Sequence, residues 1–343
     1  MRKLLNTLYV TSTEAYLSLD GENVVVQKDG EELARYPLHT LEHIISFSYS
    51  GASPALMGMC AKANINLCFC TPNGRFLARA VGKSTGNVLL RKTQYRISDS
   101  EEKSCLIARN MVFGKVFNAR WSIERTIRDH APRVDVERLL EISGFLHNSL
   151  HAIKDTNDLD SLRGMEGEAA SVYFSAFDEM ILNEKEHFYF KERSRRPPLD
   201  RVNAMLSFVY MLLANECASA LESVGLDSYV GFLHRDRPGR PSLALDLMEE
   251  LRCSLADRFV LTLINNRIIK PNDFLQRENG VVLFTDDGRK RILQQWQERK
   301  RDTITHPFLK EKMPWGLVPY VQALLLARHL RGDLDEYPPF LWK

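Results

Sequence analysis

The pattern with the most chemical content is at residues 163–174, Arg-Gly-Met-Glu-Gly-Glu-Ala-Ala-Ser-Val-Tyr-Phe. It predicts a helix whose opening turns carry Gly164 and Gly167 on either side of Glu166. A glycine inside a helix costs about 1 kcal/mol relative to alanine, so two glycines beside a carboxylate indicate that a metal ion or a phosphate approaches the backbone closely. The alternative is a small-residue face that packs two helices together and leaves Glu166 solvated, and the spacing alone favours this alternative.

A second pattern is the turn-rich segment at residues 231–240, Gly-Phe-Leu-His-Arg-Asp-Arg-Pro-Gly-Arg. It places His234 among charged residues in a loop. The pKa of an imidazole lies close to neutrality, so a loop histidine is suited to act as a metal ligand or a general base. A single histidine in a polar loop is more often an ordinary surface residue, and this pattern decides nothing by itself.

The third pattern follows directly at residues 241–252 and predicts a helix with Ser242 as its N-cap. Apolar side chains at helical spacing define a buried stripe on it, namely Leu243, Leu247 and Leu251. Asp246 and Glu249 stand three positions apart and are therefore neighbours on one face. A divalent cation would turn the repulsion between them into ligation. The alternative is a solvated acidic face.

Together the three patterns supply two carboxylates and one imidazole, and none of them contains a thiolate. Such a mixed oxygen and nitrogen site suits Mn²⁺, admits Mg²⁺ when water completes the coordination, and could also take Zn²⁺. In phosphodiester chemistry the site would polarise a phosphoryl oxygen, help to deprotonate the attacking hydroxyl and hold the reacting groups in line. Hydrolysis and strand transfer need the same groups.

The chain resembles the CRISPR-associated spacer-acquisition integrase and endonuclease family, often called CRISPR-associated protein one. The resemblance rests on these segments, in this order, and on residues 203–208 (Asn-Ala-Met-Leu-Ser-Phe). The shared series is Gly-x-Glu-Gly with alanines and Tyr-Phe, then Asn-Ala-x-Leu-Ser-Phe, then Gly-x-x-His followed by Gly-Arg-x-Ser-Leu-x-Leu-Asp-Leu-x-Glu. Cys253 departs from the family, which often has proline after the arginine that matches Arg252. The Tyr-Pro-Pro-Phe tail and the overall pattern resemble the type I subtype C branch.

The resemblance implies that Glu166, His234 and Glu249 are catalytic residues and the metal ligands, with Mg²⁺ or Mn²⁺ as cofactor and Asp246 as a further catalytic acid near the metal. It also implies a homodimer held largely through small β domains, joined to a small CRISPR-associated partner protein on DNA. The implied activity is strand transfer, in which the 3′ hydroxyl of a short DNA fragment attacks a phosphodiester of the CRISPR repeat. Nuclease activity on branched DNA is implied as well.

A segment that interleaves aromatic and basic residues, 188–196, predicts a DNA-binding loop on independent grounds. Aromatic faces stack on splayed bases, while arginine and lysine neutralise phosphates. Two further basic clusters, at residues 289–291 and 299–301, are alternatives, and each such run is more often a solvated surface than a binding site. The candidate DNA-binding residues are Lys191, Arg193, Arg195, Arg196 and, in the histidine loop, Arg240.

The elements that must position these residues fall into two parts. In the first part, short β-prone runs alternate with turn dipeptides such as Asp20-Gly21 and Asp29-Gly30, which favour tight hairpins. The expected strands are at residues 8–11, 16–19, 24–27, 66–70 and 76–81, with a helix at 54–62. This pattern predicts a small antiparallel β domain over residues 1–82, followed by a linker at 83–86.

From residue 87 to 343 the apolar period becomes helical, and we expect a larger α-helical catalytic domain, so that the fold class is α+β. A hairpin is expected at 274–285, and the tail at 333–343 is expected to be irregular. The long amphipathic segments are at residues 102–130, 136–153, 199–224 and 315–331.

Length and composition limit the number of domains, the role of the cysteines, the location of the protein and its means of binding nucleic acid. A chain of 343 residues exceeds the size at which a single core stops growing, so two domains are expected. Six cysteines without any C-x-x-C pair indicate core thiols and neither a zinc knuckle nor a disulfide framework. No apolar run approaches the roughly 20 residues of a membrane span, and we expect a cytoplasmic protein. A net charge of only +2 means that a nucleic-acid surface must be local.

Two other functions remain open from the sequence. One is a non-catalytic DNA-binding scaffold that keeps the fold and uses its acids only structurally. The other is a metal-dependent hydrolase of small phosphoesters, which is disfavoured because no Walker-type glycine loop or other nucleotide cradle is present.

Overall fold

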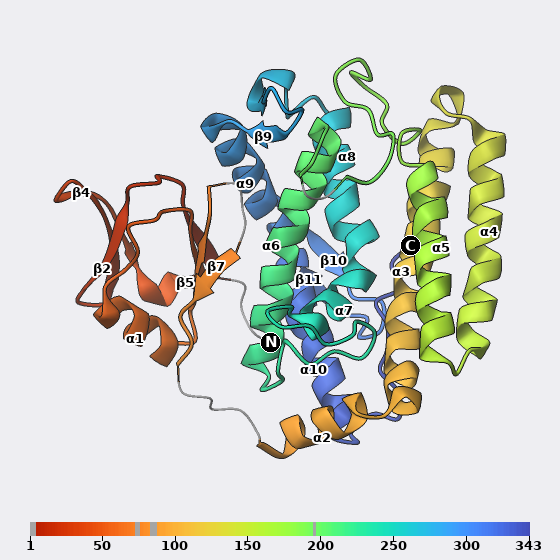
Figure 1. The fold of residues 1–343 in the computed structure, drawn as a ribbon, viewed down its shortest axis with the longest axis horizontal. Coiled ribbons are helices and arrows are strands. Elements are labelled where there is room, and N and C mark those ends of the chain that lie inside the picture. The colour runs from red at the N-terminus through yellow and green to blue at the C-terminus, as the bar shows by residue number, and fades with distance from the viewer. Residues whose placement is uncertain (1–4, 73–75, 83–87, 195–196) are drawn as a thin grey trace. The chain divides into compact units, whose positions relative to one another are not determined.

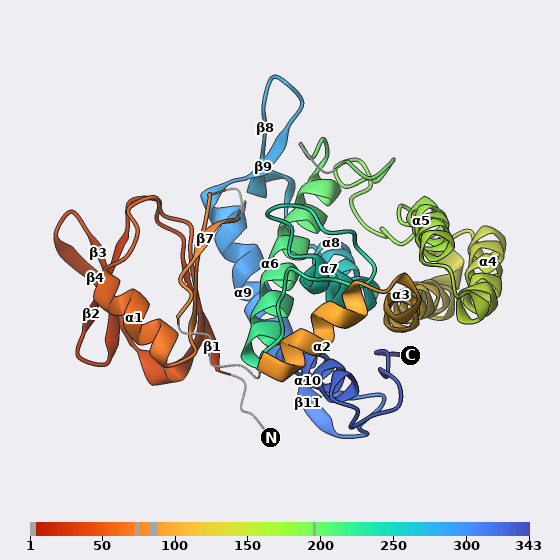
Figure 2. The ribbon, with the colours of Figure 1, turned by 60° about the horizontal axis from the view of Figure 1, so that its bottom comes forward.

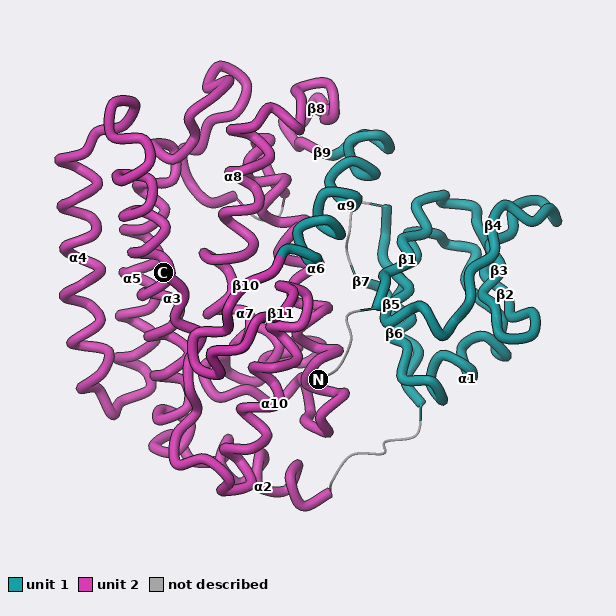
Figure 3. Tube along the Cα trace, turned by 180° about the vertical axis from the view of Figure 1, so that it is seen from behind, with its two compact units in different colours: residues 1–85, 284–302 teal, residues 86–283, 303–343 magenta. Residues whose placement is uncertain are grey.

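The computed structural model describes residues 5–72, 76–82, 88–194 and 197–343 (Figure 1). It divides into two compact units, residues 1–85 with 284–302 and residues 86–283 with 303–343 (Figure 3). The expected linker at 83–86 lies outside the described residues. The return of residues 284–302 to the first unit was not foreseen, because it depends on contacts between segments far apart in the chain.

One sheet of the first unit is an antiparallel meander of β2 (Tyr16–Asp20), β3 (Asn23–Lys28) and β4 (Glu31–Pro37). Its turns contain Gly21 and the pair Asp29 and Gly30, all with positive φ, as the sequence predicts for tight hairpins. The sequence did not reveal β4, because this edge strand is exposed on both faces and shows no alternation of apolar and polar residues.

The other sheet is mixed, in the order β1 (Asn6–Val10), β5 (Leu41–Ser46), β6 (Asn66–Cys70) and β7 (Phe76–Arg79). β1, β5 and β6 run parallel, and only β7 pairs antiparallel to its neighbour. The helix α1 (Pro54–Lys62) connects β5 to β6, and parallel neighbours require such a crossover. The α+β class is therefore confirmed, and this second sheet corrects the expectation that the β domain is antiparallel throughout.

The helix α9 (Asp286–Arg301) is fastened to this unit by two buried cations. The guanidinium of Arg289 donates to the carbonyl oxygens of Pro72 at 2.7 Å and Thr11 at 3.4 Å. The ammonium of Lys300 donates to the hydroxyl of Thr7 at 3.1 Å. One cation from each basic cluster of α9, at residues 289–291 and 299–301, therefore holds this helix against the first unit. These contacts explain why the segment returns to that unit.

The second unit is mostly helical, and Figures 1 and 2 show α3, α4 and α5 side by side with α6, α7 and α8 next to them. The long amphipathic segments expected from the sequence are all helices. Short hairpins are present at β8 (Phe274–Gln276) with β9 (Val282–Phe284), as expected, and at β10 (Thr303–Thr305) with β11 (Lys312–Pro314). The helices of this unit are α2 (Val88–Ser98), α3 (Glu101–His130), α4 (Val136–Asp155), α5 (Leu159–Ser175), α6 (Arg201–Ser223), α7 (Ser242–Leu251), a π-helix (Arg252–Asp257), α8 (Arg258–Asn265) and α10 (Val318–Leu330).

The helices α3, α5 and α6 begin at side-chain caps, whereas α7 has none. Ser100 accepts a hydrogen bond from the backbone of α3, Asp158 from that of α5 and Asp200 from that of α6. Each cap satisfies a backbone N–H that has no partner inside its helix, so each fixes where its helix begins. α6 is long and apolar enough to cross a membrane, but 78% of its most apolar window is buried inside the protein, as in a core helix.

The irregular C-terminal tail is packed onto the helical unit. Tyr337 and Phe340 are buried, and the carboxylate of Glu250 on α7 accepts hydrogen bonds from the Tyr337 hydroxyl and, at 2.6 Å, from the Phe340 backbone. The amide group of Asn118 on α3 donates to the carbonyl oxygens of Glu250 and Phe340 at 2.7 and 2.8 Å. The tail thereby ties α3 to α7. All six cysteines are buried free thiols, as the sequence predicts.

Candidate functional site

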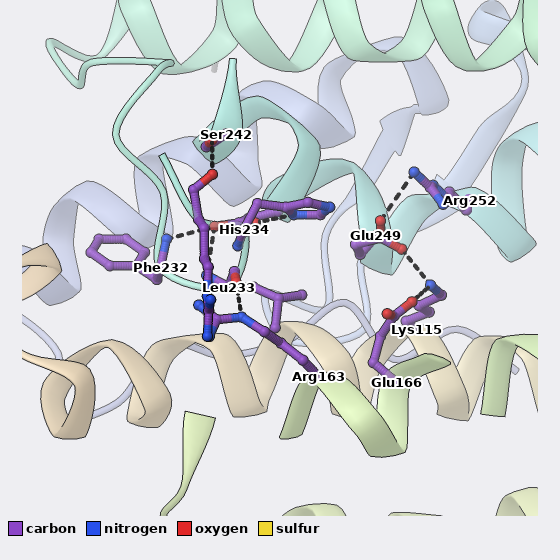
Figure 4. Close-up of polar contacts among 11 residues, drawn as sticks. Lys115, Arg163, Glu166, Phe232, Leu233, His234, Ser242, Glu249 and Arg252 are labelled. Carbon is purple, nitrogen blue, oxygen red and sulfur yellow. Dashed lines mark hydrogen bonds and ion pairs between the residues drawn. The ribbon is translucent and has the colours of Figure 1, made fainter. Parts of the chain in front are cut away.

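Four segments of the helical unit bring charged side chains together (Figure 4). The ammonium of Lys115 on α3 contacts the carboxylate of Glu166 on α5 and lies 2.7 Å from Oε2 of Glu249 on α7. The guanidinium of Arg252, at the start of the π-helix, lies 3.0 Å from Oε1 of the same Glu249. The two acids expected from the sequence are therefore joined through one cation that the sequence analysis did not identify.

A signal for Lys115 is present in the sequence. It stands in α3 among residues that are nearly all apolar or small, Met-Val-Phe-Gly-Lys-Val-Phe. A lysine on a buried helix face needs a partner, because a buried unpaired charge is strongly disfavoured. The partners come from α5 and α7, and the sequence gives no means of placing these helices beside α3.

Burial and charge set the protonation of this cluster. The side chains of Lys115 and Glu249 are 8% and 3% exposed, while that of Glu166 is 24% exposed. Burial alone raises the pKa of Glu249, but the positive charges of Arg252 and Lys115 outweigh burial and lower its pKa to about 2. Burial lowers the pKa of Lys115, and the two carboxylates more than offset this effect. The site therefore holds Glu249 as a carboxylate and Lys115 as an ammonium.

Asp246 is fully buried and holds the histidine loop in place. Its Oδ2 accepts hydrogen bonds from the backbone of Phe232 at 2.6 Å and of Leu233 at 2.9 Å. Its Oδ1 accepts from the backbone of His234 at 3.0 Å and lies 2.6 Å from Nδ1 of the same ring. A carboxylate beside Nδ1 favours the tautomer with the proton on Nδ1, which leaves Nε2 to bind a ligand or move a proton.

A glycine makes this arrangement sterically possible. A Cβ atom added at Gly231 would lie 2.7 Å from Oδ2 of Asp246 and 2.9 Å from Cβ of Ser242. The loop is also tied to α5, because the guanidinium of Arg163 donates to the carbonyl oxygen of Leu233 at 2.7 Å. Arg163 is one helical turn before Glu166, so α5 positions the loop as well as one acid.

The third sequence pattern needs one correction. Ser242 is not the N-cap of α7: Pro241 occupies that position, and the Ser242 side chain donates instead to the carbonyl oxygen of Arg235 at 3.4 Å. The expected apolar stripe of leucines is confirmed as fully buried. Asp246 and Glu249 are both buried and partnered, which excludes a solvated acidic face.

The glycines beside Glu166 face open space. A Cβ atom added at Gly164 or Gly167 would meet no atom within 4 Å. The alternative drawn from the sequence was tight helix packing through these two residues. The described part of the chain does not show such packing.

The donor set fits a hard divalent cation, although the described residues contain no cluster of three or more His, Cys, Asp or Glu side chains close enough to hold one. Oε2 of Glu249 is buried and lies 2.7 Å from the Lys115 nitrogen. A buried carboxylate oxygen that already faces a cation is suited to ligate a metal ion in its place. The convergence of Glu166, His234 and Glu249 on one metal ion remains a prediction, and it requires Lys115 to move.

The candidate DNA-binding residues differ in their surroundings. Lys191 is exposed, with its ammonium 5.7 Å from the centre of the Tyr189 ring. Arg240 is partly exposed, and burial together with repulsion from Arg237 lowers its pKa more than the charge of Asp246 raises it. Arg193 has hydrogen-bond partners inside the protein. Arg195 and Arg196 lie outside the described residues.

Comparison with known proteins gives consistent results. The family model described as "CRISPR associated protein Cas1" matches residues 8–298. The chain is 50% identical to "CRISPR-associated endonuclease Cas1 2" of Rhodospirillum rubrum over the full length of both proteins. Its fold is similar to that of a "Casposase bound to integration product" (TM-score 0.84, 23% identity, 99% of this chain and 95% of that one). It is also similar to a chain of a "Cas6-RT-Cas1--Cas2 complex" (TM-score 0.82, 22% identity, 100% of this chain and 36% of that one).

Proposed function

Because the chain belongs to the CRISPR associated protein Cas1 family, we propose that it is a metal-dependent DNA integrase and endonuclease of CRISPR adaptation. It inserts short DNA fragments into the repeat array. The observation that carries this proposal is the pair Glu166 and Glu249, whose carboxylates share one cationic partner, the ammonium of Lys115.

Glu166, Glu249 and the free Nε2 of His234 are the groups that would hold Mg²⁺ or Mn²⁺. When bound, the metal ion polarises the phosphoryl oxygen and lowers the pKa of the attacking hydroxyl. Asp246 fixes the orientation of His234, and Arg252 keeps Glu249 ionised. These contacts prepare the ligands before DNA binds, which reduces the reorganisation needed during the reaction.

The proposed reaction exchanges one phosphodiester for another. The 3′ oxygen of the incoming fragment forms a bond to a repeat phosphorus, the bond from that phosphorus to the repeat 3′ oxygen breaks, and the leaving oxygen takes up a proton. The number of phosphodiesters is unchanged, so no external energy source is needed. With water in place of the 3′ hydroxyl the same groups hydrolyse branched DNA.

We extend the same proposal to the partners. The name of one structural neighbour gives an integration product and that of the other a complex with Cas2, and we propose that this chain likewise binds DNA and a small partner of the Cas2 kind in the cytoplasm. We further propose a homodimer formed through the first unit. Its edge strand β4 exposes Leu33 (55%) and Tyr36 (41%), which pairing between two copies would bury.

The test is integration of a short duplex into a repeat-bearing plasmid with Mn²⁺, Mg²⁺ or EDTA. Wild-type protein should integrate only with a metal ion, and Glu166→Gln should lose activity. Glu168→Gln is the matched control, because Glu168 is exposed on the same helix two positions away. Activity in EDTA, or wild-type activity of Glu166→Gln, would overturn the assignment.

A non-catalytic scaffold is the second candidate. The ion pairs of Lys115 with both acids favour it, since buried acids also serve as structural partners. In that case wild-type protein binds branched DNA but neither cleaves nor integrates it with any metal ion, and the same assay separates the two functions.

A further inference from the structure

Two arginines from different segments share one aromatic ring on α6. The guanidinium carbon of Arg193 lies 5.4 Å from the centre of the Tyr210 ring, and that of Arg252 lies 4.9 Å from it. The hydroxyl of Tyr210 donates to Oδ1 of Asp257 at 2.5 Å. Arg193 belongs to the irregular segment between α5 and α6, whereas Arg252 and Asp257 are the first and last residues of the π-helix.

Arg193 is built into this cluster. Its guanidinium donates to Oδ1 of Asn203 at 2.6 Å, to the Ser207 hydroxyl at 3.1 Å and to the carbonyl oxygen of Ser194 at 2.7 Å. Asn203 in turn donates to the carbonyl oxygen of Glu192 at 2.8 Å. The planar fork of an arginine is matched to such a set of acceptors, and a lysine would lose most of these contacts.

The other arginine of the cluster reaches the candidate active site. Arg252 lies 3.0 Å from Oε1 of Glu249, and both side chains are nearly buried. Two cations beside one ring repel each other, and the negative charges of Asp257 and Glu249 offset this repulsion. The face of Tyr210 gives the Arg252 guanidinium a fixed plane, and Arg193 helps to hold that ring in place.

We propose that Arg193 is a positioning residue for Glu249, acting through Tyr210 and Arg252, and is not a phosphate contact. This inference rests on the proposed function and assigns a role that differs from the expectation drawn from the sequence. It also connects the segment that carries the exposed Lys191 to the candidate metal ligands.

The test compares Arg193→Lys with two variants of the same segment. Arg193→Lys should lower kcat about tenfold through misplacement of the ligand, while KM for DNA and the salt dependence of DNA binding stay within about twofold of wild type. Lys191→Ala should instead reduce the slope of log affinity against log salt by about 0.7 to 0.9. Lys185→Ala, an exposed cation paired with Asp178, is the control and should change neither.

Two tyrosine variants separate the ring from its hydroxyl. Tyr210→Phe keeps the ring and should retain most of kcat, whereas Tyr210→Leu should reproduce the loss seen in Arg193→Lys. If Arg193→Lys leaves kcat unchanged, or if the charge-removing variant Arg193→Gln lowers the salt slope as Lys191→Ala does, the proposal is wrong.

A readout without catalysis covers the case in which the wild-type protein proves inactive. Urea unfolding of Arg193→Lys, Glu249→Gln and the double variant forms a double-mutant cycle. If the change in unfolding free energy of the double variant differs from the sum of the changes of the two single variants, Arg193 and Glu249 are coupled, as proposed. Additive changes overturn it, whatever the activity of the wild-type protein.

Discussion

The ammonium of Lys115 lies between the carboxylates of Glu166 and Glu249, 2.7 Å from Oε2 of Glu249. Under the proposed function a metal ion would bind between these two acids, where the protein's own cation now lies. The positive charge of Lys115 helps to lower the pKa of Glu249. We therefore expect metal binding to compete with the Lys115 ion pairs.

Replacing Lys115 by methionine should therefore expose that competition. The metal-free variant should lose about 3 kcal/mol of unfolding free energy, because the buried carboxylate of Glu249 and the partly exposed one of Glu166 lose their shared partner. Added Mn²⁺ should raise its thermal unfolding midpoint more than that of wild type. Lys103→Met, at an exposed position of α3, is the control. An equal response of wild type and Lys115→Met to Mn²⁺ would contradict this competition.

Two adjacent glutamates should give opposite pH dependences. Burial raises the pKa of Glu250 to about 7 despite hydrogen bonds from Tyr337, Phe340 and Gln322, whereas the pKa of Glu249 is lowered to about 2. A raised pKa means that the folded protein binds the proton more tightly, so the contribution of Glu250 is complete below pH 4.5 and is lost as the pH rises toward 7. The contribution of Glu249 is present above pH 4.5 and is lost as the pH falls toward 2.

We therefore expect Glu250→Gln to flatten the dependence of unfolding free energy on pH between 4.5 and 7. The effect should be on the order of 3 kcal/mol, since one pKa unit corresponds to about 1.4 kcal/mol. Glu249→Gln should change the dependence only below pH 4.5. Urea unfolding across this pH range measures both, and an unchanged pH profile for Glu250→Gln would show that Glu250 titrates normally.

Gly231→Ala should damage the site without unfolding the protein. The added methyl group would lie 2.7 Å from Oδ2 of Asp246 and displace this carboxylate, so that His234 loses its orientation. We expect integration to fall by about two orders of magnitude, as for other small misplacements of catalytic groups. Gly144→Ala is the control, because a Cβ atom there meets nothing within 4 Å in the middle of α4. Near-normal activity of Gly231→Ala would mean that Asp246 does not fix the orientation of the His234 ring.

Arg240→Ala should weaken DNA binding in a salt-dependent manner. Its guanidinium makes no hydrogen bond or ion pair with any described residue, and it stands six positions after His234. Loss of one phosphate contact should lower the log-log salt slope by about 0.9 on duplex DNA. Filter binding over a salt series measures this slope. If it is unchanged, exposed cations of α9 such as Lys290 are the next candidates.

Charge on strand β4 should separate the proposed homodimer. Leu33→Lys and Tyr36→Lys together place two cations on the exposed edge of the first unit, where like charges would meet across a two-fold axis. Light scattering should then report a monomer with an unchanged circular dichroism spectrum. Lys substitution at Val81, exposed at the end of that unit, is a control for added charge. A persisting dimer would place the contact elsewhere.

The sequence by itself determined the local elements of this protein. Hairpin dipeptides and apolar spacing act within a few positions of one another, and they gave the β2–β3 and β3–β4 turns, α1 and the long helices. The order of the motifs also sufficed for the resemblance that the family match confirms. The subtype C branch remains a prediction.

The tertiary structure decided which side chains meet. Lys115 and Glu166 are 51 positions apart, and Arg289 reaches Pro72 across 217 positions, so neither contact leaves a periodic signal in the sequence. The same holds for Arg193, which looked like a DNA contact in a basic run and has buried partners on α6. A cation in a sequence has no fixed role, because its energy depends on the burial and on the acids that other segments bring to it.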